Sequence, residues 1–470
     1  MAMHIKLDYK KTALVGLAFM TINAVWQLYN TEVPIILTKM IQDLIEAAGN
    51  GAWIIENGVT RFDTNFPVTT VVNVIMSLDN VLAIFLLPLL GKLSDKTNTR
   101  FGKRTPFILV GVVLTALFLP FVPLFYTQNS IVGVIIMLFG VLLAMSLYRT
   151  PAVALMPDVT PKPLRSRANA IINLMGAAGN VTVAAIAAVV SIAVRDNPGV
   201  YYTVMFIATA AIILIALLVM LLTVNENKLV AMMPPDIETE EERMLREGKG
   251  KDIHSSVKLS LFFILSAVFF WYMAYGCIET NFSRFAETVL GMDAYTVPML
   301  VATIAALICF LPLGILSGKL GRKNTIIIGL GVLLGCAVLS TFITNHAILY
   351  VLFAFIGISW AAINVNSYPM VVEMSKGGDI GKYTGIYYTF QMAAQVITPI
   401  LSGVIIDISD VLFAKYIGNG LRILFPYASV FLACALVVMF FVKHGDSKDT
   451  DVQIFTEKLE EIEVAQSNGI

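Results

Sequence analysis

Three ionisable side chains lie inside long apolar stretches of this chain. Asp79, Arg149 and Glu279 each fall in a stretch long enough to cross a bilayer, and Glu32 lies toward the end of another. An ionisable group at membrane depth costs about 2.5–3.5 kcal/mol on insertion scales, so such residues mark functional sites. A carboxyl group there can take up and release a proton, whereas arginine keeps its charge and binds carboxylates or hydroxyl groups.

Asp79 or Glu279 together with Arg149 therefore forms a candidate set for coupling transport to protons or for contacting substrate. A structural ion pair between helices is the alternative for these three residues. Glu32 could instead lie at the water boundary, which leaves it a weaker candidate.

Amide side chains recur at helical spacing in three apolar stretches. The sets are Asn23, Gln27 and Asn30; Asn169, Asn173 and Asn180; and Gln391 and Gln395 after Tyr388. Amides that face lipid would leave donors and acceptors unpaired at a cost of several kcal/mol each. They therefore face a water-filled cavity or make hydrogen bonds between helices, and both remain open. The candidates for contact with substrate or proton are Asn23, Gln27, Asn364, Gln391 and Gln395.

A short turn between two apolar stretches, residues 91–108, carries five Lys or Arg around one aspartate. Asp95 is placed to meet the positive N-terminal end of a neighbouring helix. Gly91 and Gly102 permit a close approach and a sharp bend. Arg100 and Arg104 are placed to pair with Asp158, at the next turn on the same side of the membrane.

The composition indicates a membrane protein. Hydrophobic residues form 57% of the chain and charged residues 14%, against about 25% charged in soluble domains. A spanning helix needs about 20 apolar residues, and twelve stretches qualify, so we predict an all-α membrane protein with twelve transmembrane helices. They lie near 11–37, 67–91, 105–126, 130–155, 168–194, 200–224, 258–280, 294–316, 324–343, 347–371, 383–408 and 420–442.

The four cysteines fall inside these stretches, which argues against a disulfide framework and against a metal site.

The order of the stretches predicts two related halves. Most Lys and Arg fall on one side of the predicted membrane, which places both termini in the cytoplasm. We expect an N-terminal six-helix bundle at 1–224, a cytoplasmic linker at 225–257, a second bundle at 258–443 and a cytoplasmic tail at 444–470. An internal repeat with an offset of 215 residues pairs Asp158 with Glu373. The segment at 38–66 is the longest predicted outside loop.

The motifs resemble one family closely. The turn, Gly-x-x-Ser-Asp followed by Arg-Phe-Gly-x-Arg-x-Pro-Phe-Ile, resembles the loop between spans two and three of the major facilitator superfamily. This form is closest to the loop of the sucrose:proton symporters and their glycoside–pentoside–hexuronide:cation relatives. A second segment is also similar to theirs: Ala154-Leu155 before Asp158, then Ala168-Asn169-Ala170 and Gly179-Asn180. In sucrose symporters an arginine directly precedes Ala-Leu. Val153 holds that place here, and Arg149 is one helical turn earlier.

The resemblance implies two pseudo-symmetric six-helix bundles around a central site, and a cytoplasmic gate formed by Gly91, Asp95, Arg100, Gly102, Arg104 and Asp158. We therefore expect a monomeric symporter in the plasma membrane that moves a sugar or glycoside inward with protons. The alternatives are a sodium-coupled transporter, a carrier of lipid or drug-like cargo, and a non-transporting receptor. No motif predicts an enzyme, a cofactor or nucleic-acid binding.

Overall fold

The computed structural model describes residues 7–49, 51–56, 59–64, 68–194, 197–233, 251–292, 297–375, 379–417 and 419–446. Within this part of the chain, twelve helical segments are long and apolar enough to cross a membrane. The predicted all-α fold with twelve spans is therefore confirmed. Most of the predicted linker, 225–257, and of the predicted tail, 444–470, lies outside the described residues.

The first bundle is formed by the helices that precede the linker. These are α1 (Tyr9–Ala47), α2 (Val68–Lys96), α3 (Thr105–Phe118), α4 (Phe121–Thr127), α5 (Ile131–Asp158), α6 (Arg165–Ala193) and α7 (Pro198–Thr223), with a 3-10 turn, η1 (Lys162–Leu164), before α6. A short helix, α8 (Glu226–Ala231), follows α7. The third span consists of α3 and α4 rather than one helix, because Pro120 has no amide hydrogen to continue the helical ladder.

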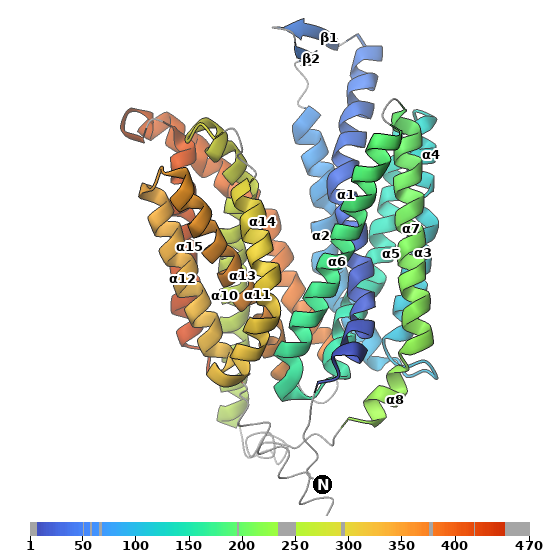
Figure 1. Ribbon diagram of the computed structural model, residues 1–470, viewed down its shortest axis with the longest axis vertical. Coiled ribbons are helices and arrows are strands. Elements are labelled where there is room, and N and C mark those ends of the chain that lie inside the picture. The colour runs from blue at the N-terminus through green and yellow to red at the C-terminus, as the bar shows by residue number, and fades with distance from the viewer. Residues whose placement is uncertain are drawn as a thin grey trace, which may run out of the picture.

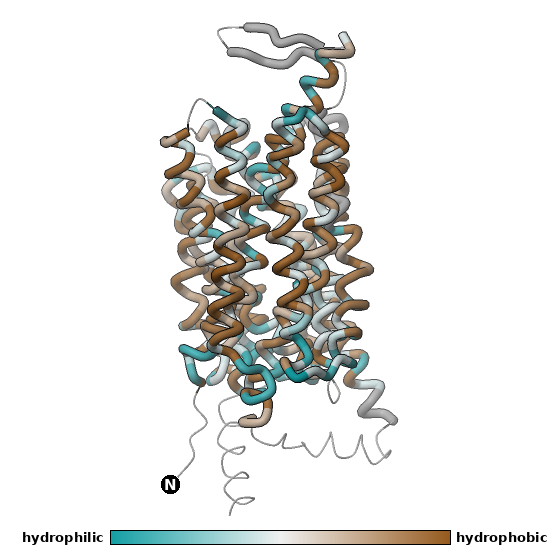
Figure 2. The backbone as a smooth tube through the Cα atoms, turned by 90° about the vertical axis from the view of Figure 1, so that its right-hand side faces the viewer, coloured by the Kyte–Doolittle hydropathy of each residue, from teal (hydrophilic) through white to brown (hydrophobic). Residues whose placement is uncertain are grey.

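The second bundle repeats this plan. It contains α10 (Lys251–Thr288), α11 (Val297–Leu320), α12 (Arg322–Phe342), α13 (His346–Glu373), α14 (Ile380–Ile417) and α15 (Leu424–Phe440), with a 3-10 turn, η2 (Gly420–Ile423), before α15. Figure 1 shows the two bundles side by side, close together at one end and diverging toward the other. The apolar residues run along the middle of the helices and the polar ones gather near their ends (Figure 2).

The segment predicted as a simple outside loop, 38–66, is partly regular structure. Helix α1 continues to Ala47, because Met40, Ile41 and Ile45 remain buried along it. An antiparallel hairpin follows, with β1 (Gly51–Glu56) paired to β2 (Val59–Thr64). The hairpin stands beyond the bundles in Figure 1. We call this end of the molecule the hairpin end, and the opposite end, which carries residues 97–104, the loop end.

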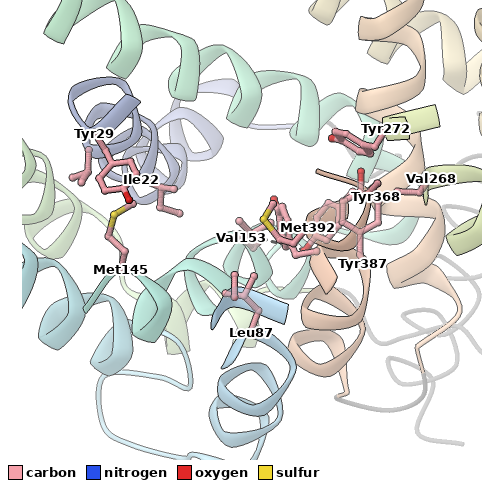
Figure 3. Packing of buried hydrophobic residues seen from close by; sticks show 14 of the residues in the cluster. Ile22, Tyr29, Leu87, Met145, Val153, Val268, Tyr272, Tyr368, Tyr387 and Met392 are labelled. Carbon is pink, nitrogen blue, oxygen red and sulfur yellow. Dashed lines mark hydrogen bonds between the residues drawn. The ribbon is translucent and has the colours of Figure 1, made fainter. Parts of the chain in front are cut away.

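Helices of the two bundles pack directly against one another as well as within each bundle. Helix α2 packs on α14, and α6 packs on α11 and α13. Buried side chains continue across this boundary: Figure 3 shows Val153 of α5 among the second-bundle residues Met392 and Tyr368. Buried residues of both halves therefore belong to one continuous apolar cluster.

Candidate functional site

A cavity of about 440 Å³ lies between the two bundles. Its walls come from α1, α5 and α6 of the first bundle and from α10, α11, α13 and α14 of the second. Six of the residues predicted to contact substrate or proton line it: Asn23, Arg149, Glu279, Asn364, Gln391 and Gln395. Polar groups from both bundles thus converge on one cavity.

Arg149 on α5 contacts aromatic rings from both bundles. Its guanidinium carbon lies 5.3 Å from the ring centre of Trp26 on α1 and 5.1 Å from that of Tyr388 on α14. Its Nη1 lies 4.0 Å from the sulfur of Met392, also on α14. Cation–π contact stabilises a guanidinium that has lost part of its hydration. Because Trp26 and Tyr388 belong to different halves, any relative movement of the bundles changes the surroundings of this charge.

Glu279 reaches the same cavity from α10. Its side chain is exposed, although it lies on a helix long enough to span the membrane. Tyr275 and Tyr272, four and seven residues earlier, line the cavity with it, because this spacing places them on one helix face. A carboxylate that faces a water-accessible cavity avoids most of the cost of burial in lipid. Arg149 and Glu279 therefore bring opposite charges to one cavity from opposite bundles.

Amides on α6 and α14 face the cavity, one of the two arrangements that their spacing allowed. Asn169, Asn173 and Asn180 line it from α6, and Gln391 and Gln395 from α14. One amide also bonds between helices, since Asn169 Nδ2 donates to backbone carbonyls of α13. The two functions left open by the sequence, cavity lining and interhelical bonding, are thus both present.

Two predicted candidates lie elsewhere. Gln27 is half-buried and is not among the cavity-lining residues, because it lies just outside the face of α1 that carries the lining residues Asn23 and Trp26. Glu32 is buried and accepts a hydrogen bond of 3.0 Å from the Tyr201 hydroxyl of α7, so it joins two helices of one bundle. Asp79 belongs to α2, but its side chain lies outside the described residues.

Aromatic rings form a large part of the cavity wall. Trp26, Tyr275, Trp360, Tyr387 and Tyr388 all line it. Three others, Tyr29, Tyr148 and Trp271, are buried in the core instead. Rings combined with amides suit a solute that has both apolar faces and hydroxyl groups.

At the loop end, Arg104 is the centre of a buried ionic cluster. Its Nε donates to Asp158 at 2.6 Å and its Nη2 donates to Asp95 at 2.6 Å, while Nη1 donates to the Ser94 hydroxyl. The arginine is 0% exposed. Guanidinium–carboxylate bonds of this length are charge-assisted and fix the geometry of all partners. The end of α2, the start of α3 and the end of α5 are therefore joined through one side chain.

Asp95 connects this cluster to the second bundle. Its two carboxylate oxygens accept hydrogen bonds from the backbone amides of Gly381, at 2.9 Å, and Lys382, at 2.8 Å. These amides belong to the first turn of α14, where the helix leaves its N–H groups unpaired and carries partial positive charge. A side chain at Gly91 would collide with the Gly381 carbonyl oxygen, so glycine is needed for α2 to approach α14.

Arg100 does not pair with Asp158, contrary to the expectation from the sequence. Its side chain is exposed, and its guanidinium lies over the ring of Phe101 at 4.8 Å. Asp158 and Asp95 are already bound by Arg104. Arg100 therefore lies at the surface of the loop rather than within the ionic cluster.

Glu226, the first residue of α8, was not identified from the sequence. Its carboxylate accepts hydrogen bonds from the amides of Lys103, Arg104 and Thr105 at 2.7–3.1 Å, and from the Thr105 hydroxyl at 2.8 Å. It thereby caps the N-terminus of α3, which has no cap of its own. An acidic residue directly after the sixth span can be recognised in the sequence. Nothing in the sequence, however, indicates its contact with a loop more than a hundred residues earlier.

We expect Gly102→Ala to destabilise this loop. Gly102 has φ +112°, and an added Cβ would collide with the Glu226 carboxylate. Backbone strain of this kind costs about 1–3 kcal/mol, apart from the displaced cap. Thermal unfolding in detergent should show a lower Tm. As a matched control, Gly331→Ala adds a methyl group in open space on α12 and should not lower it; equal losses would contradict the explanation.

A second ionic cluster lies at the loop end of the other bundle. Glu373, at the end of α13, accepts from Arg165 Nη1 at 2.6 Å and lies 3.4 Å from Arg322 Nη1. Arg165 begins α6 of the first bundle, so this cluster also joins the halves. The internal repeat pairs Asp158 with Glu373, and the structure gives them equivalent partners. Asp158 binds Arg104 and Glu373 binds Arg322. In both cases the arginine lies at the start of the span that precedes the acid's own.

The comparison with protein families identifies the chain. A model of the Major Facilitator Superfamily matches residues 13–344 and 299–461. The chain belongs to this superfamily. Its members are membrane transporters, and the protein is therefore a multi-pass membrane transporter of small molecules. A search of curated protein sequences finds no significant match.

Solved structures share the fold at low sequence identity. The human organic anion transporter MFSD10 (TETRAN) is 14% identical with a TM-score of 0.59, over 93% of this chain and 100% of that one. The Escherichia coli fucose:proton symporter FucP is 14% identical with a TM-score of 0.60, over 93% and 100%. A double-tryptophan XylE mutant is 13% identical with a TM-score of 0.67, over 97% and 98%.

Proposed function

We propose that this transporter moves a sugar or glycoside inward together with protons. The observation that carries the proposal is the cavity between the bundles, which combines amides, aromatic rings, Arg149 and Glu279. Rings can stack on pyranose faces while amides bond to hydroxyl groups. Two further points support it: the motifs similar to sucrose:proton symporters, and the fold shared with a fucose:proton symporter. In this proposal Glu279 exchanges the coupled proton.

The same proposal assigns the loop end to the cytoplasm and the protein to the plasma membrane. The cluster of Arg104, Asp95 and Asp158 then acts as a cytoplasmic gate, with Gly91 and Gly102 permitting its geometry. With the halves joined at the loop end, this conformation corresponds to the outward-facing state of alternating access. Release of substrate to the cytoplasm requires these contacts to break.

Uptake into proteoliposomes tests the function. Purified protein is reconstituted, and a panel of labelled disaccharides and glycosides is offered with an inward proton gradient, an inward sodium gradient or neither. We expect accumulation of at least one sugar driven by the proton gradient. Accumulation driven only by sodium would overturn the coupling. Transport confined to lipids or organic anions would overturn the substrate class, and no transport of any solute would favour a receptor.

We expect Arg149→Lys to weaken uptake of the identified sugar. A lysine keeps the charge but loses the planar group that contacts Trp26 and Tyr388, so a loss of about 1–2 kcal/mol, about tenfold in kcat/KM, is expected. Arg284→Lys makes the same chemical change at an exposed position near the end of α10 and serves as the control. Equal uptake by both variants would remove Arg149 from the proposed site.

A further inference from the structure

Prolines inside three helices release backbone carbonyls next to the boundary between the halves. Pro88 lies in α2, Pro157 in α5 and Pro369 in α13. A proline has no amide hydrogen, so the carbonyl four residues earlier loses its helical partner. The carbonyls released in this way belong to Ile84, Val153 and Val365.

Each released carbonyl accepts a hydrogen bond from a side chain of the opposite half. Asn169 Nδ2, on α6, donates to Val365 at 2.9 Å and to the neighbouring Asn364 carbonyl at 3.2 Å. Asn169 is 5% exposed and Val365 is 0% exposed, so the bond is largely buried although Asn169 borders the cavity. The donor comes from the first bundle and the acceptor from the second.

The other two bonds run in the opposite direction. The Tyr368 hydroxyl of α13 lies 3.3 Å from the Val153 carbonyl of α5, and the Thr389 hydroxyl of α14 lies 3.2 Å from the Ile84 carbonyl of α2. Tyr368 and Val153 lie close together in Figure 3. Both hydroxyls have a second partner in their own half, Thr384 and Gly385 respectively, at 3.0 Å. The Asn169–Val365 bond, at 2.9 Å, is the shortest of the three.

We propose that Asn169, Tyr368 and Thr389 are positioning residues that favour the state closed at the loop end, by supplying donors to the carbonyls that the prolines release. A buried carbonyl without a partner is costly. When the halves part, these carbonyls lose their donors, and water must enter to replace them. The prolines thus make closure depend on side chains of the opposite bundle. This rests on the proposed alternating access and adds to it a set of residues outside the ionic clusters.

A double-mutant cycle on Asn169 and Pro369 tests this. Pro369→Ala restores the amide that pairs with Val365 inside α13, so the donor of Asn169 should lose its importance. Spin labels at Lys96→Cys and Lys319→Cys, both exposed at the loop end of different halves, report closed and open distances. The native cysteines at 277, 309, 336 and 434 are replaced by alanine, and each variant is first checked for folding by its elution profile and Tm.

We expect Asn169→Ala to raise the ratio of open to closed molecules about fivefold, the effect of one hydrogen bond. In the Pro369→Ala background the same substitution should raise it less than twofold. Pro312→Ala is the control, because the carbonyl released by Pro312 belongs to Ile308, which is 69% exposed on α11; it should leave the ratio unchanged.

The result that overturns the proposal is an equal effect of Asn169→Ala in both backgrounds, which would indicate a packing role. If Asn169→Ala does not fold, Tyr368→Phe with Pro157→Ala forms the same cycle and is judged by the same criterion. Arg104→Ala separates the role of the released carbonyls from the proposed alternating access. If it opens the loop end and Asn169→Ala does not, only the role of the released carbonyls fails. If no variant opens the loop end, alternating access fails as well.

Discussion

Arg104→Ala is expected to lower the free energy of unfolding by about 3–5 kcal/mol. The substitution leaves Asp95 and Asp158 without the cation that both now contact at 2.6 Å, in a cluster where the arginine is fully buried. Removing one partner of a buried ion pair lowers stability by more than the pair itself contributes, because the remaining charge is buried without compensation. Thermal unfolding in detergent measures the loss, and the loop-end spin labels should report an increased open fraction.

Arg100→Ala provides the matched control. It removes an arginine side chain from the same loop, four residues before Arg104. The Arg100 guanidinium is exposed and lies over Phe101. Surface substitutions of this kind change stability by about 0.5 kcal/mol or less. A similar loss of stability for both variants would show that the net charge of the loop matters, and that the buried geometry of Arg104 does not.

The sequence predicted the fold because membrane insertion is governed by the length and composition of each segment. An apolar stretch of about 20 residues crosses the bilayer as a helix, because in lipid the backbone must satisfy its own hydrogen bonds. Outside the bilayer this constraint ends. The continuation of α1 to Ala47 depends on the burial of residues such as Met40 and Ile45. The hairpin from Gly51 to Thr64 depends on local strand pairing. Neither was predicted.

The site was predictable where helical periodicity decides which face is polar. Asn23, Gln391 and Gln395 line the cavity for this reason, whereas Gln27 shares the spacing but lies just outside the face of α1 that borders the cavity. Helical spacing groups residues on one face, but it does not give the width of the face that borders a cavity. Arg100 illustrates a second limit, because charge and proximity in sequence could not decide which of two arginines reaches Asp158.

Contacts between distant segments were the least predictable part of the gate. Glu226 caps α3 from a helix that follows span six, and Arg165 of the first bundle binds Glu373 of the second. The internal repeat did hold part of this information. It pairs Asp158 with Glu373, and the structure places both acids in arginine clusters at the loop end. A repeat thus identifies equivalent positions, but the partners must be found in three dimensions.

Glu279→Gln is expected to abolish accumulation driven by a proton gradient while leaving downhill movement of substrate intact. One coupled proton per solute allows about tenfold accumulation for each pH unit of gradient, since 1.4 kcal/mol corresponds to a factor of ten. The glutamine keeps the size of the side chain in the cavity but cannot take up a proton. The internal concentration of the identified sugar should therefore rise only to the external one, a loss of about tenfold at one pH unit.

The control is Glu32→Gln, the same chemical change on a carboxylate that bonds to Tyr201 away from the cavity. A glutamine there still accepts this hydrogen bond, so accumulation should remain close to that of the unaltered protein. Exchange of labelled for unlabelled sugar, measured without a gradient, shows whether Glu279→Gln still binds and carries substrate. Loss of exchange together with accumulation would make Glu279 a substrate ligand rather than a proton carrier. Full accumulation by Glu279→Gln would assign the proton to another group in the same cavity or in α2, where Asp79 lies.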